Sequence, residues 1–461
     1  MSIVFYDLSF LVIFTLAVVL FLYKRRSKLE REGILYLYRT QIGIKFINYV
    51  GGRFEKFWSK LGYVVIFSGY VMMITMVYLL IQILYIYIKQ PLFVQAIKIP
   101  PIAPLIPYLP SLFKADFLPM FYFTYWIISI AIIATVHEFS HGIFARHARL
   151  KIKSTGFGFL GPLLAAFVEP DEKKMQKIDK KNQLAILCAG SFANLITAIL
   201  FFFIMWLFFI GTFIPSGVIV GGYSSTQVST ADISSMGGGI GISIDGFNLT
   251  QIEVGENIYF TNLEKVNLSS EKINVFIDSP ALRAELMGII TEFDGEEVKD
   301  SFDLSEKLYK RNVGDKIVVK TLLNDSREEY EITLGKNPIN QSLPFLGIVL
   351  GTQASRGVLG GLRETISFFK VPGTNYLSKI NWDLGVFIYN LFWWIILINI
   401  SVALVNMLPV GIFDGGRVFY VTMLTVLKSE RWAKKAYLAA TYIIILVFVL
   451  LTVIWGVNYF K

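Results

Sequence analysis

The stretch Met120–His147 reads MFYFTYWIISIAIIATVHEFSHGIFARH, and its apolar first part runs directly into His137-Glu138-Phe139-Ser140-His141. On a helix, side chains four positions apart lie on one face, about one turn from each other. Two imidazoles at that spacing can hold one zinc ion, and a glutamate beside the first can take a proton from the bound water. The stretch therefore predicts an apolar helix that carries both metal ligands and a general base.

The location of this pattern determines how strongly it indicates a metal site, because H-E-x-x-H alone arises by chance in many proteins. Here the pattern continues the apolar run Met120–Val136, so it lies within a predicted membrane helix. Ionisable side chains inside a membrane are energetically costly and are usually functional. The alternative is a polar helix end in the membrane interface, with His147 as a further interfacial side chain. That alternative leaves Glu138 unexplained.

The composition of the 461-residue chain is that of a membrane protein, since 54% of its residues are hydrophobic and only 17% are charged. A helix needs about 20 apolar residues to cross a bilayer. The first apolar run has no basic segment before it and no small-residue cleavage site after it, so we expect a retained helix. The stretches long and apolar enough to span a membrane are 3–23, 62–88, 120–145, 184–214, 384–408 and 436–457.

Basic residues set the expected orientation, because loops rich in Lys and Arg stay on the cytoplasmic side. Such residues gather in 24–61, in 146–183 and in the link 428–435. We therefore expect a multi-pass protein of the cell membrane, with its N-terminus and 215–383 outside the cytoplasm. The net charge is +9, but no basic helix or zinc-finger spacing accompanies it in the sequence, so nucleic acid is not an expected partner.

Composition divides the chain into four regions. Gly, Ser, Thr and Asp rise within 220–350, where short β-type runs such as Lys316–Lys320 and Glu329–Leu334 appear. We expect a polytopic α-helical membrane protein, with about six transmembrane helices and an extracytoplasmic α+β domain before the fifth. The Pro-rich loop 91–119 should not form a regular helix. The regions are 1–119 with helices one and two, 120–214 with the motif helix and a re-entrant loop, 215–383 with the inserted domain, and 384–461 with helices five and six.

A catalytic zinc usually has three protein ligands and an open position for water, so the two histidines require a third ligand. The single cysteine, Cys188, lies in an apolar run and is most simply a small buried residue. Among the acids, Asp414 stands out because it follows a long apolar run at a helix break made by Pro409 and Gly411. A carboxylate at such a break can turn into the protein interior. An ordinary turn with a solvated aspartate is the alternative.

At these residues the sequence resembles the site-2 protease family of intramembrane metalloproteases. Members of that family carry H-E-x-x-H on one helix and N-x-x-P-x-x-x-x-D-G on a later helix. Both motifs are complete here, at His137–His141 and Asn406–Gly415. A glycine-led segment with an asparagine, another family feature, matches Gly190–Asn194 between them. The resemblance covers about 120–420 of the chain.

The resemblance implies the chemistry of the site. It implies a Zn²⁺ ion bound by His137, His141 and Asp414, with Glu138 activating a water molecule. It also implies that Asn194 and Asn406 help to hold the substrate or the oxyanion. For Asn194, an interhelical hydrogen bond is an equal alternative.

The resemblance extends to the inserted domain and to the partners. The family commonly carries a PDZ-type insert, and Ser279–Leu286, Gly288–Ile290 and Asp294-Gly295 look like the helix-turn-strand part of such a domain. The glycine run Met236–Ile242 resembles a peptide-binding loop, although glycine runs are more often plain turns. The lack of a Cys-rich outer domain suggests an archaeal-type or bacterial-type member. The implied partners are transmembrane protein substrates, some already cut by another protease, and membrane lipid.

Two further expectations concern the site. The apolar, Gly-rich segment Gly156–Pro170 is expected to form a re-entrant hairpin whose strand edge pairs with an unwound substrate, and an interfacial loop is the alternative. A transporter with a metal site and a non-catalytic zinc-binding scaffold are the alternative functions. We see no internal repeat in the sequence to support a transporter. A structural zinc site fills all four positions, so it would not need Glu138.

Overall fold

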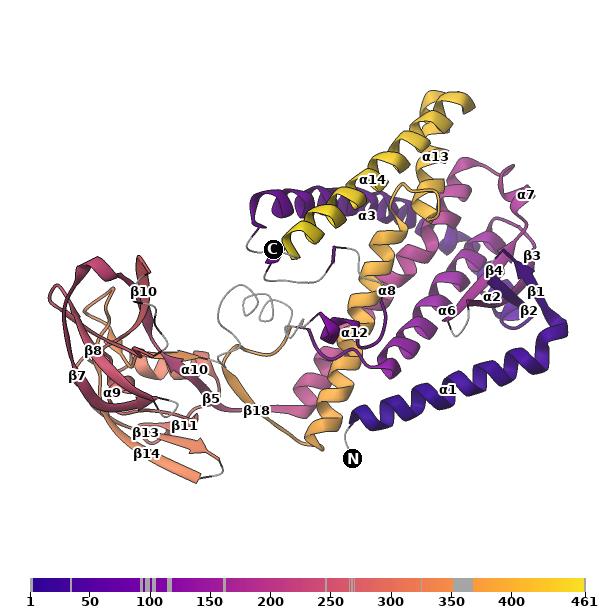
Figure 1. Cartoon of the computed structure of the whole chain (residues 1–461). Coiled ribbons are helices and arrows are strands. Elements are labelled where there is room, and N and C mark those ends of the chain that lie inside the picture. The colour runs from indigo at the N-terminus through magenta and orange to yellow at the C-terminus, as the bar shows by residue number, and fades with distance from the viewer. Residues whose placement is uncertain are drawn as a thin grey trace. The chain divides into compact units, whose positions relative to one another are not determined.

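The structure is a computed structural model of the chain, and it divides into two compact units (Figure 1). The membrane unit comprises Met1–Phe208 and Val386–Lys461, and the inserted unit comprises Phe209–Gly385. The structure describes residues 3–459 except 34, 92–93, 96–99, 102–104, 114–117, 161–162, 245–246, 265, 267, 269, 325 and 351–367.

Six described helices are long and apolar enough to cross a membrane, which confirms the predicted number of spans. Each corresponds to one predicted apolar run: α1, α3 and α14 contain the whole run, and α6, α8 and α12 miss two or three of its residues at one end. For example, α3 begins at Glu55, ahead of the apolar run, because residues 55–61 include no proline or glycine to interrupt the helix. These helices are α1 (Ile3–Arg25), α3 (Glu55–Lys89), α6 (Phe123–His147), α8 (Lys180–Thr212), α12 (Trp382–Asn406) and α14 (Glu430–Tyr459).

The membrane unit also contains an antiparallel sheet of order β1-β2-β3-β4, and β4 lies along α6 (Figure 1). Strands β3 and β4 form a hairpin where the sequence predicts one, starting at Ile152 rather than Gly156. The sequence did not predict β1 and β2, because β1 is almost entirely charged and both lie in the basic segment 24–61 expected to be a cytoplasmic loop. The strands are β1 (Leu29–Glu32), β2 (Leu35–Thr40), β3 (Ile152–Leu160) and β4 (Leu163–Pro170).

A polar cluster holds β2, β3 and β4 together at the open end of the hairpin. The Ser154 hydroxyl donates to Glu169 Oε2 at 2.7 Å, and Arg39 Nε donates to the same oxygen at 3.2 Å. These bonds, led by the one from Ser154, hold the pKa of Glu169 below its usual value. The sheet therefore has a cross-strand anchor close to the residues of β4 that face α6.

Helix α1 is fastened to the start of α6 by one buried carboxylate. Asp7 accepts hydrogen bonds from the backbone N–H groups of Phe123 and Thr124, both at 2.8 Å, and from the Thr124 hydroxyl at 2.5 Å. The Tyr108 hydroxyl also donates to it. The first N–H groups of a helix have no partner within the helix, and a negative charge is favourable there. Asp7 thus caps α6 from a helix that is remote in the sequence.

The core of the membrane unit lies among α2, α3, α6, α8 and α13. It includes Ile47, Phe144, Cys188, Met407 and Val418, all buried, so the cysteine is a small core residue as predicted. The shorter elements of this unit are η1 (Arg26–Lys28), α2 (Ile44–Arg53), α5 (Leu109–Leu112), α7 (Glu172–Met175) and α13 (Asp414–Leu427), with α5 in the Pro-rich loop.

The inserted unit is an α+β body, as predicted. One sheet has the order β14-β13-β11-β5-β17, with β12 and β18 attached, and a second has the order β6-β10-β9-β8-β7. The predicted strand runs form β13 and β14. Its elements are β5 (Phe213–Tyr223), β6 (Ser225–Ser229), η2 (Thr230–Asp232), β7 (Ile233–Ile244), β8 (Phe247–Val254), β9 (Asn257–Thr261), β10 (Lys272–Ile277), α9 (Pro280–Arg283), β11 (Ile289–Phe293), β12 (Glu296–Glu297), α10 (Ser301–Tyr309), β13 (Lys316–Leu323), β14 (Ser326–Thr333), β15 (Gly335–Lys336), β16 (Pro344–Phe345), β17 (Ile348–Leu350) and β18 (Thr374–Ser378).

One prediction in this unit is wrong. The glycine run Met236–Ile242 is not a loop but part of β7, which pairs with β8. Backbone pairing in this hairpin outweighs the weak strand preference of glycine, and register shifts between Met236 and Gly239 and again before Ser243 absorb the irregularity. By contrast, α9 followed by a turn and β11 has the predicted helix-turn-strand order.

Candidate metal centre

Two histidines and an aspartate from separate parts of the chain meet inside the membrane unit. His137 and His141 lie on one face of α6, and their Nε2 atoms are 3.1 Å apart. The Asp414 Oδ2 atom lies 3.3 Å from each of these nitrogens. The three ligand atoms lie within 4.8 Å of one another, which is the grouping expected of a metal site. His137 is buried and the other two side chains are partly buried.

The turn before α13 places the aspartate. Helix α12 ends at Asn406, the chain turns through Pro409, and α13 begins at Asp414. A Cβ atom at Gly415 would collide with the Met407 carbonyl, and one at Gly416 with the Val410 carbonyl. Helix α13 can therefore start this close to the preceding turn only because glycines follow the aspartate, which explains the D-G-G sequence in physical terms.

Helix α8 approaches the ligands through a residue without a side chain. A Cβ atom at Gly190 would lie 2.5 Å from His141 Nε2 and 2.6 Å from His137 Nε2. Any other residue at this position would fill the space beside the two ligating nitrogens. A glycine here, together with two nitrogen donors and one carboxylate oxygen, fits a bound zinc ion.

Fixed hydrogen bonds orient both imidazoles. His141 Nδ1 lies 2.7 Å from the Ile186 carbonyl oxygen, so Nδ1–H donates and the lone pair of Nε2 is free for a metal. His137 Nδ1 lies 3.1 Å from the side-chain amide of Asn194. The Asn194 Oδ1 atom is buried with no described partner, so we assign the amide with this oxygen accepting from His137 Nδ1–H. Both histidines then present Nε2 to the metal.

Glu138 has a partner on the neighbouring sheet. Its Oε2 atom accepts a hydrogen bond of 3.0 Å from the backbone N–H of Val168 on β4. The Glu138 side chain is partly buried, and its other oxygen has no described bond to the sheet. A carboxylate held at one oxygen and next in sequence to a metal ligand is suited to proton transfer.

The two predicted asparagines have different outcomes. The structure gives Asn194 a direct hydrogen bond to His137, which is an interhelical bond of the kind named as its alternative. Asn406 is partly buried at the end of α12, and its role toward substrate stays a prediction. Sequence reasoning missed Val168 and the Ile186 carbonyl, since both act through the backbone and carry no side-chain signal.

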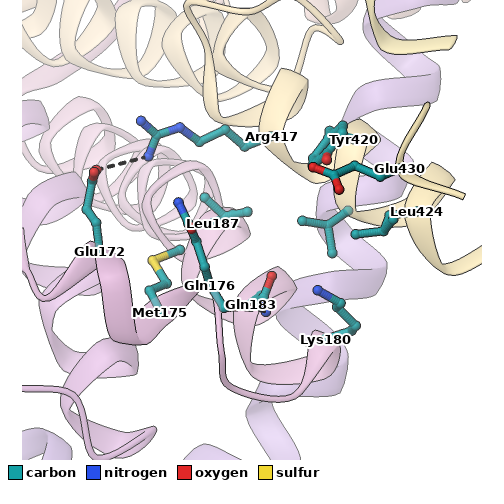
Figure 2. A pocket seen from close by; sticks show the side chains of 11 residues that line it. Glu172, Met175, Gln176, Lys180, Gln183, Leu187, Arg417, Tyr420, Leu424 and Glu430 are labelled. Atoms are coloured by element: carbon teal, nitrogen blue, oxygen red, sulfur yellow. Dashed lines mark hydrogen bonds and ion pairs between the residues drawn. The ribbon is translucent and has the colours of Figure 1, made fainter. Parts of the chain in front are cut away.

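A cavity of about 570 Å³ lies between α7, α8, α13 and α14 (Figure 2). Arg417 lies one turn after Asp414, and Leu187 follows the carbonyl that holds His141, so the cavity borders the elements that carry the site. Arg417 Nη1 and Glu172 Oε1 lie 3.5 Å apart across it. Its further lining residues are Met175, Gln176, Lys180, Gln183, Tyr420, Val421, Leu424 and Glu430.

A multi-pass membrane chain with this ligand set and an adjacent glutamate has the make-up of a membrane metallopeptidase. A family model described as "Peptidase family M50" matches residues 125–451, and the chain belongs to this family, the site-2 protease family that its motifs resemble. An uncharacterized protein of Methanocaldococcus jannaschii is 32% identical over 199 residues. That match covers 40% of this chain and 48% of the relative, so the chain spans about half of the relative's length.

Proposed function

We propose that this chain is an intramembrane zinc metalloprotease that hydrolyses peptide bonds of transmembrane proteins within or next to the bilayer. The main support is the meeting of His137, His141 and Asp414 beside Glu138. Three protein ligands leave one position of a tetrahedral zinc open for water, which is typical of catalytic and not of structural sites. Membership in peptidase family M50 supports the same chemistry.

The residues of the site have complementary roles in this reaction. Zinc at the three ligands would polarise the scissile carbonyl and acidify the attacking water. Glu138 accepts one proton as the water oxygen bonds to the carbonyl carbon. It then delivers that proton to the amine nitrogen as the C–N bond breaks, and the second water proton stays with the new carboxyl group. Asn194 and the Ile186 carbonyl keep the two imidazoles in the tautomer that binds metal.

The edge of β4 is the proposed binding place of the substrate backbone. A transmembrane substrate is helical, and its peptide bonds are shielded until it unwinds. In the described part of the sheet, β4 pairs only with β3, so no strand occupies its other edge. At Val168 that edge meets α6, whose Glu138 accepts the Val168 N–H, so a further strand would pair with the part of β4 that Glu138 leaves unbonded. An unwound segment can add to it by backbone hydrogen bonds.

The proposed orientation follows from the basic segments. The N-terminus and 215–383 lie outside the cytoplasm, while 24–61 and 146–183 are cytoplasmic. Under this topology the histidines lie nearer the cytoplasmic end of α6, and water reaches them from that side. Two polar side chains, Lys180 and Gln183, line the cavity at the proposed cytoplasmic start of α8, as expected if water enters from that side.

The inserted unit is proposed to be PDZ-like and to select substrates without taking part in the chemistry. Its sequence contains no histidine and no cysteine, and α9 leads through a turn into β11 in the order the resemblance implies. We favour exclusion of substrates that still carry a bulky outer domain. Regulated proteolysis would then require an earlier cut by another protease.

The direct test is a Glu138→Gln variant, purified and assayed on a single-span substrate in proteoliposomes. Glutamine keeps the size of the side chain but cannot take the proton, so we expect unchanged zinc and a loss of cleavage of at least about 10²-fold. Near-normal turnover would remove Glu138 from the mechanism. If the wild-type protein binds zinc and cuts no substrate, the scaffold and transporter alternatives gain support.

A further inference from the structure

The backbone of β4 points its hydrogen-bonding groups in two directions. Val168 lies opposite Thr155 of β3, yet its N–H group donates to Glu138 Oε2 at 3.0 Å. In an antiparallel pair, residues that bond to the partner strand alternate with residues whose N–H and C=O groups point away from it. The N–H and C=O groups of Val168 therefore face the open edge of the sheet.

The same alternation gives the direction of the backbone N–H and C=O groups of the neighbouring residues. Ala166 lies opposite Phe157, two positions before Val168. Its N–H and C=O groups therefore also point away from β3, toward the open edge. Phe167 lies opposite Gly156 and bonds toward β3 instead. A strand that adds to β4 can use Ala166 fully, but at Val168 the N–H group is already bonded to Glu138.

Val168 is held firmly in this place. Its side chain is 8% exposed and packs in the core beside Ile47. Its Cγ1 atom lies 3.1 Å from where a Cβ atom of Gly142 would stand, and Gly142 directly follows the metal ligand His141. The donor and the carboxylate are thus fixed on two elements that pack against each other, so their bond can orient Glu138.

We infer that the Val168 backbone N–H positions Glu138 for proton transfer and, because this donor is occupied, sets the register in which a substrate strand pairs with β4 at Ala166. This inference rests on the proposed function and adds a positioning group and a binding group to it. With Oε2 held by the N–H, the other Glu138 oxygen is directed to the water. The substrate binds through the groups of Ala166, and its peptide bond at the level of Val168 lies beside Glu138.

Proline variants separate the two roles, because proline removes an N–H group and is tolerated where that group faces an open strand edge. Val168→Pro is expected to retain zinc and to lower kcat by about 10–100-fold with little change in KM, the scale of losing a supporting hydrogen bond at a metal site. Val168→Ala loses the same side-chain packing but keeps the N–H group, so kcat of Val168→Pro should lie at least about tenfold below kcat of Val168→Ala. Ala166→Pro should raise KM by about tenfold or more at similar kcat, because one strand-pairing bond is lost. Equal kcat values in Val168→Pro and Val168→Ala, or an unchanged KM in Ala166→Pro, would overturn the inference.

A second measurement needs neither a folded proline variant nor activity. Amide hydrogen exchange at Val168 is compared in the wild-type protein and in Glu138→Ala, both in detergent micelles. We expect the Val168 amide to be protected in the wild type and to exchange at least about tenfold faster in the variant. Equal exchange would show that the carboxylate does not hold this N–H, and would overturn the inference even if the enzyme cleaves as proposed. Faster exchange in Glu138→Ala, together with a wild-type protein that cleaves no substrate, would uphold the contact and contradict only the proposed function.

Discussion

The membrane unit and the inserted unit bury different kinds of polar side chain. Among the described residues, the buried polar side chains of the inserted unit, such as Thr261 and Ser279, are all hydroxyls. Those of the membrane unit include Asp7, His137 and Asn194, which can carry charge or hold a metal ligand. Burying such groups is costly unless each has a partner, and the hydrogen bonds above supply partners.

This difference teaches where the chemistry can reside. A hydroxyl-only interior fits a binding or supporting body, because it offers neither a metal ligand nor a group that titrates near neutral pH. The membrane unit concentrates its metal ligands and its general base at one point. Changes at that point should therefore remove activity, and large changes in the inserted unit should alter only which substrates enter.

The largest effect is expected from a single methyl group on α8. In Gly190→Ala the new Cβ would stand 2.5 Å from His141 Nε2, so the histidines must move out of their ligand positions. We expect zinc content to fall close to zero and cleavage to be lost with it, because the metal supplies the activated water. Zinc is measured by mass spectrometry of the purified protein.

The matched control is Gly211→Ala on the same helix. A Cβ atom there meets nothing within 4 Å, so zinc and cleavage should stay at wild-type values. Full zinc content in Gly190→Ala would mean that α8 does not approach the ligands as described.

A smaller effect is expected at Asn194, where it distinguishes two roles. Asn194→Ala removes the acceptor for His137 Nδ1–H, so zinc affinity should fall by about 10–100-fold in competition with a chelator. Asn194→Asp keeps an acceptor oxygen and should recover most of that affinity. If the alanine variant binds zinc normally and only kcat falls, Asn194 acts on the substrate or the oxyanion, as the family resemblance implies.

The smallest effect on chemistry is expected from removing the second sheet of the inserted unit. The two ends of the segment that forms β6–β10 lie close together, since the Ile277 N–H donates to the Ser224 carbonyl at 2.9 Å. Replacing residues 225–276 by a short Gly-Ser link also removes Leu249 and Phe260 from the core of this unit, so folding of the variant is checked by circular dichroism. Zinc and cleavage of a shortened substrate should stay within about threefold of wild type, because the metal ligands and Glu138 all lie in the membrane unit.

The same variant tests the proposed sieve. If this sheet excludes bulky substrates, the shortened enzyme should cut substrates that keep a folded outer domain. A variant that folds, binds zinc, cuts shortened substrates and still rejects the bulky ones would place the selection elsewhere.

The sequence predicted the parts of the structure whose signals are local. The apolar runs and the spacing of His137 and His141 indicate membrane helices and a ligand pair without knowledge of any contact. Pro409 and the glycines break an apolar helix, and this break singles out Asp414 as a candidate ligand. The same residues are also compatible with an ordinary turn that carries a solvated aspartate. Their meeting in space required the folded chain.

The remaining features depend on contacts between distant segments. Strand β1 is nearly all charged and shows no apolar alternation, so only its pairing with β2 reveals it. The cap from Asp7 to α6 joins residues far apart in the sequence. The bond from Val168 to Glu138 uses a backbone N–H, which almost every residue type has, so the sequence cannot indicate it. The glycine run in β7 is wrongly predicted as a loop, because its composition favours a turn and the sequence does not show its pairing with β8.

The central claim is that Asp414 completes a zinc site with two histidines remote in sequence. The most direct measurement is the zinc content of Asp414→Ala, purified beside the wild-type protein in detergent, with secondary structure checked by circular dichroism. With only two ligands left, we predict that the variant keeps its helical content but loses its zinc and its cleavage of a single-span substrate. A folded variant with the zinc content and the cleavage of the wild type would contradict the account.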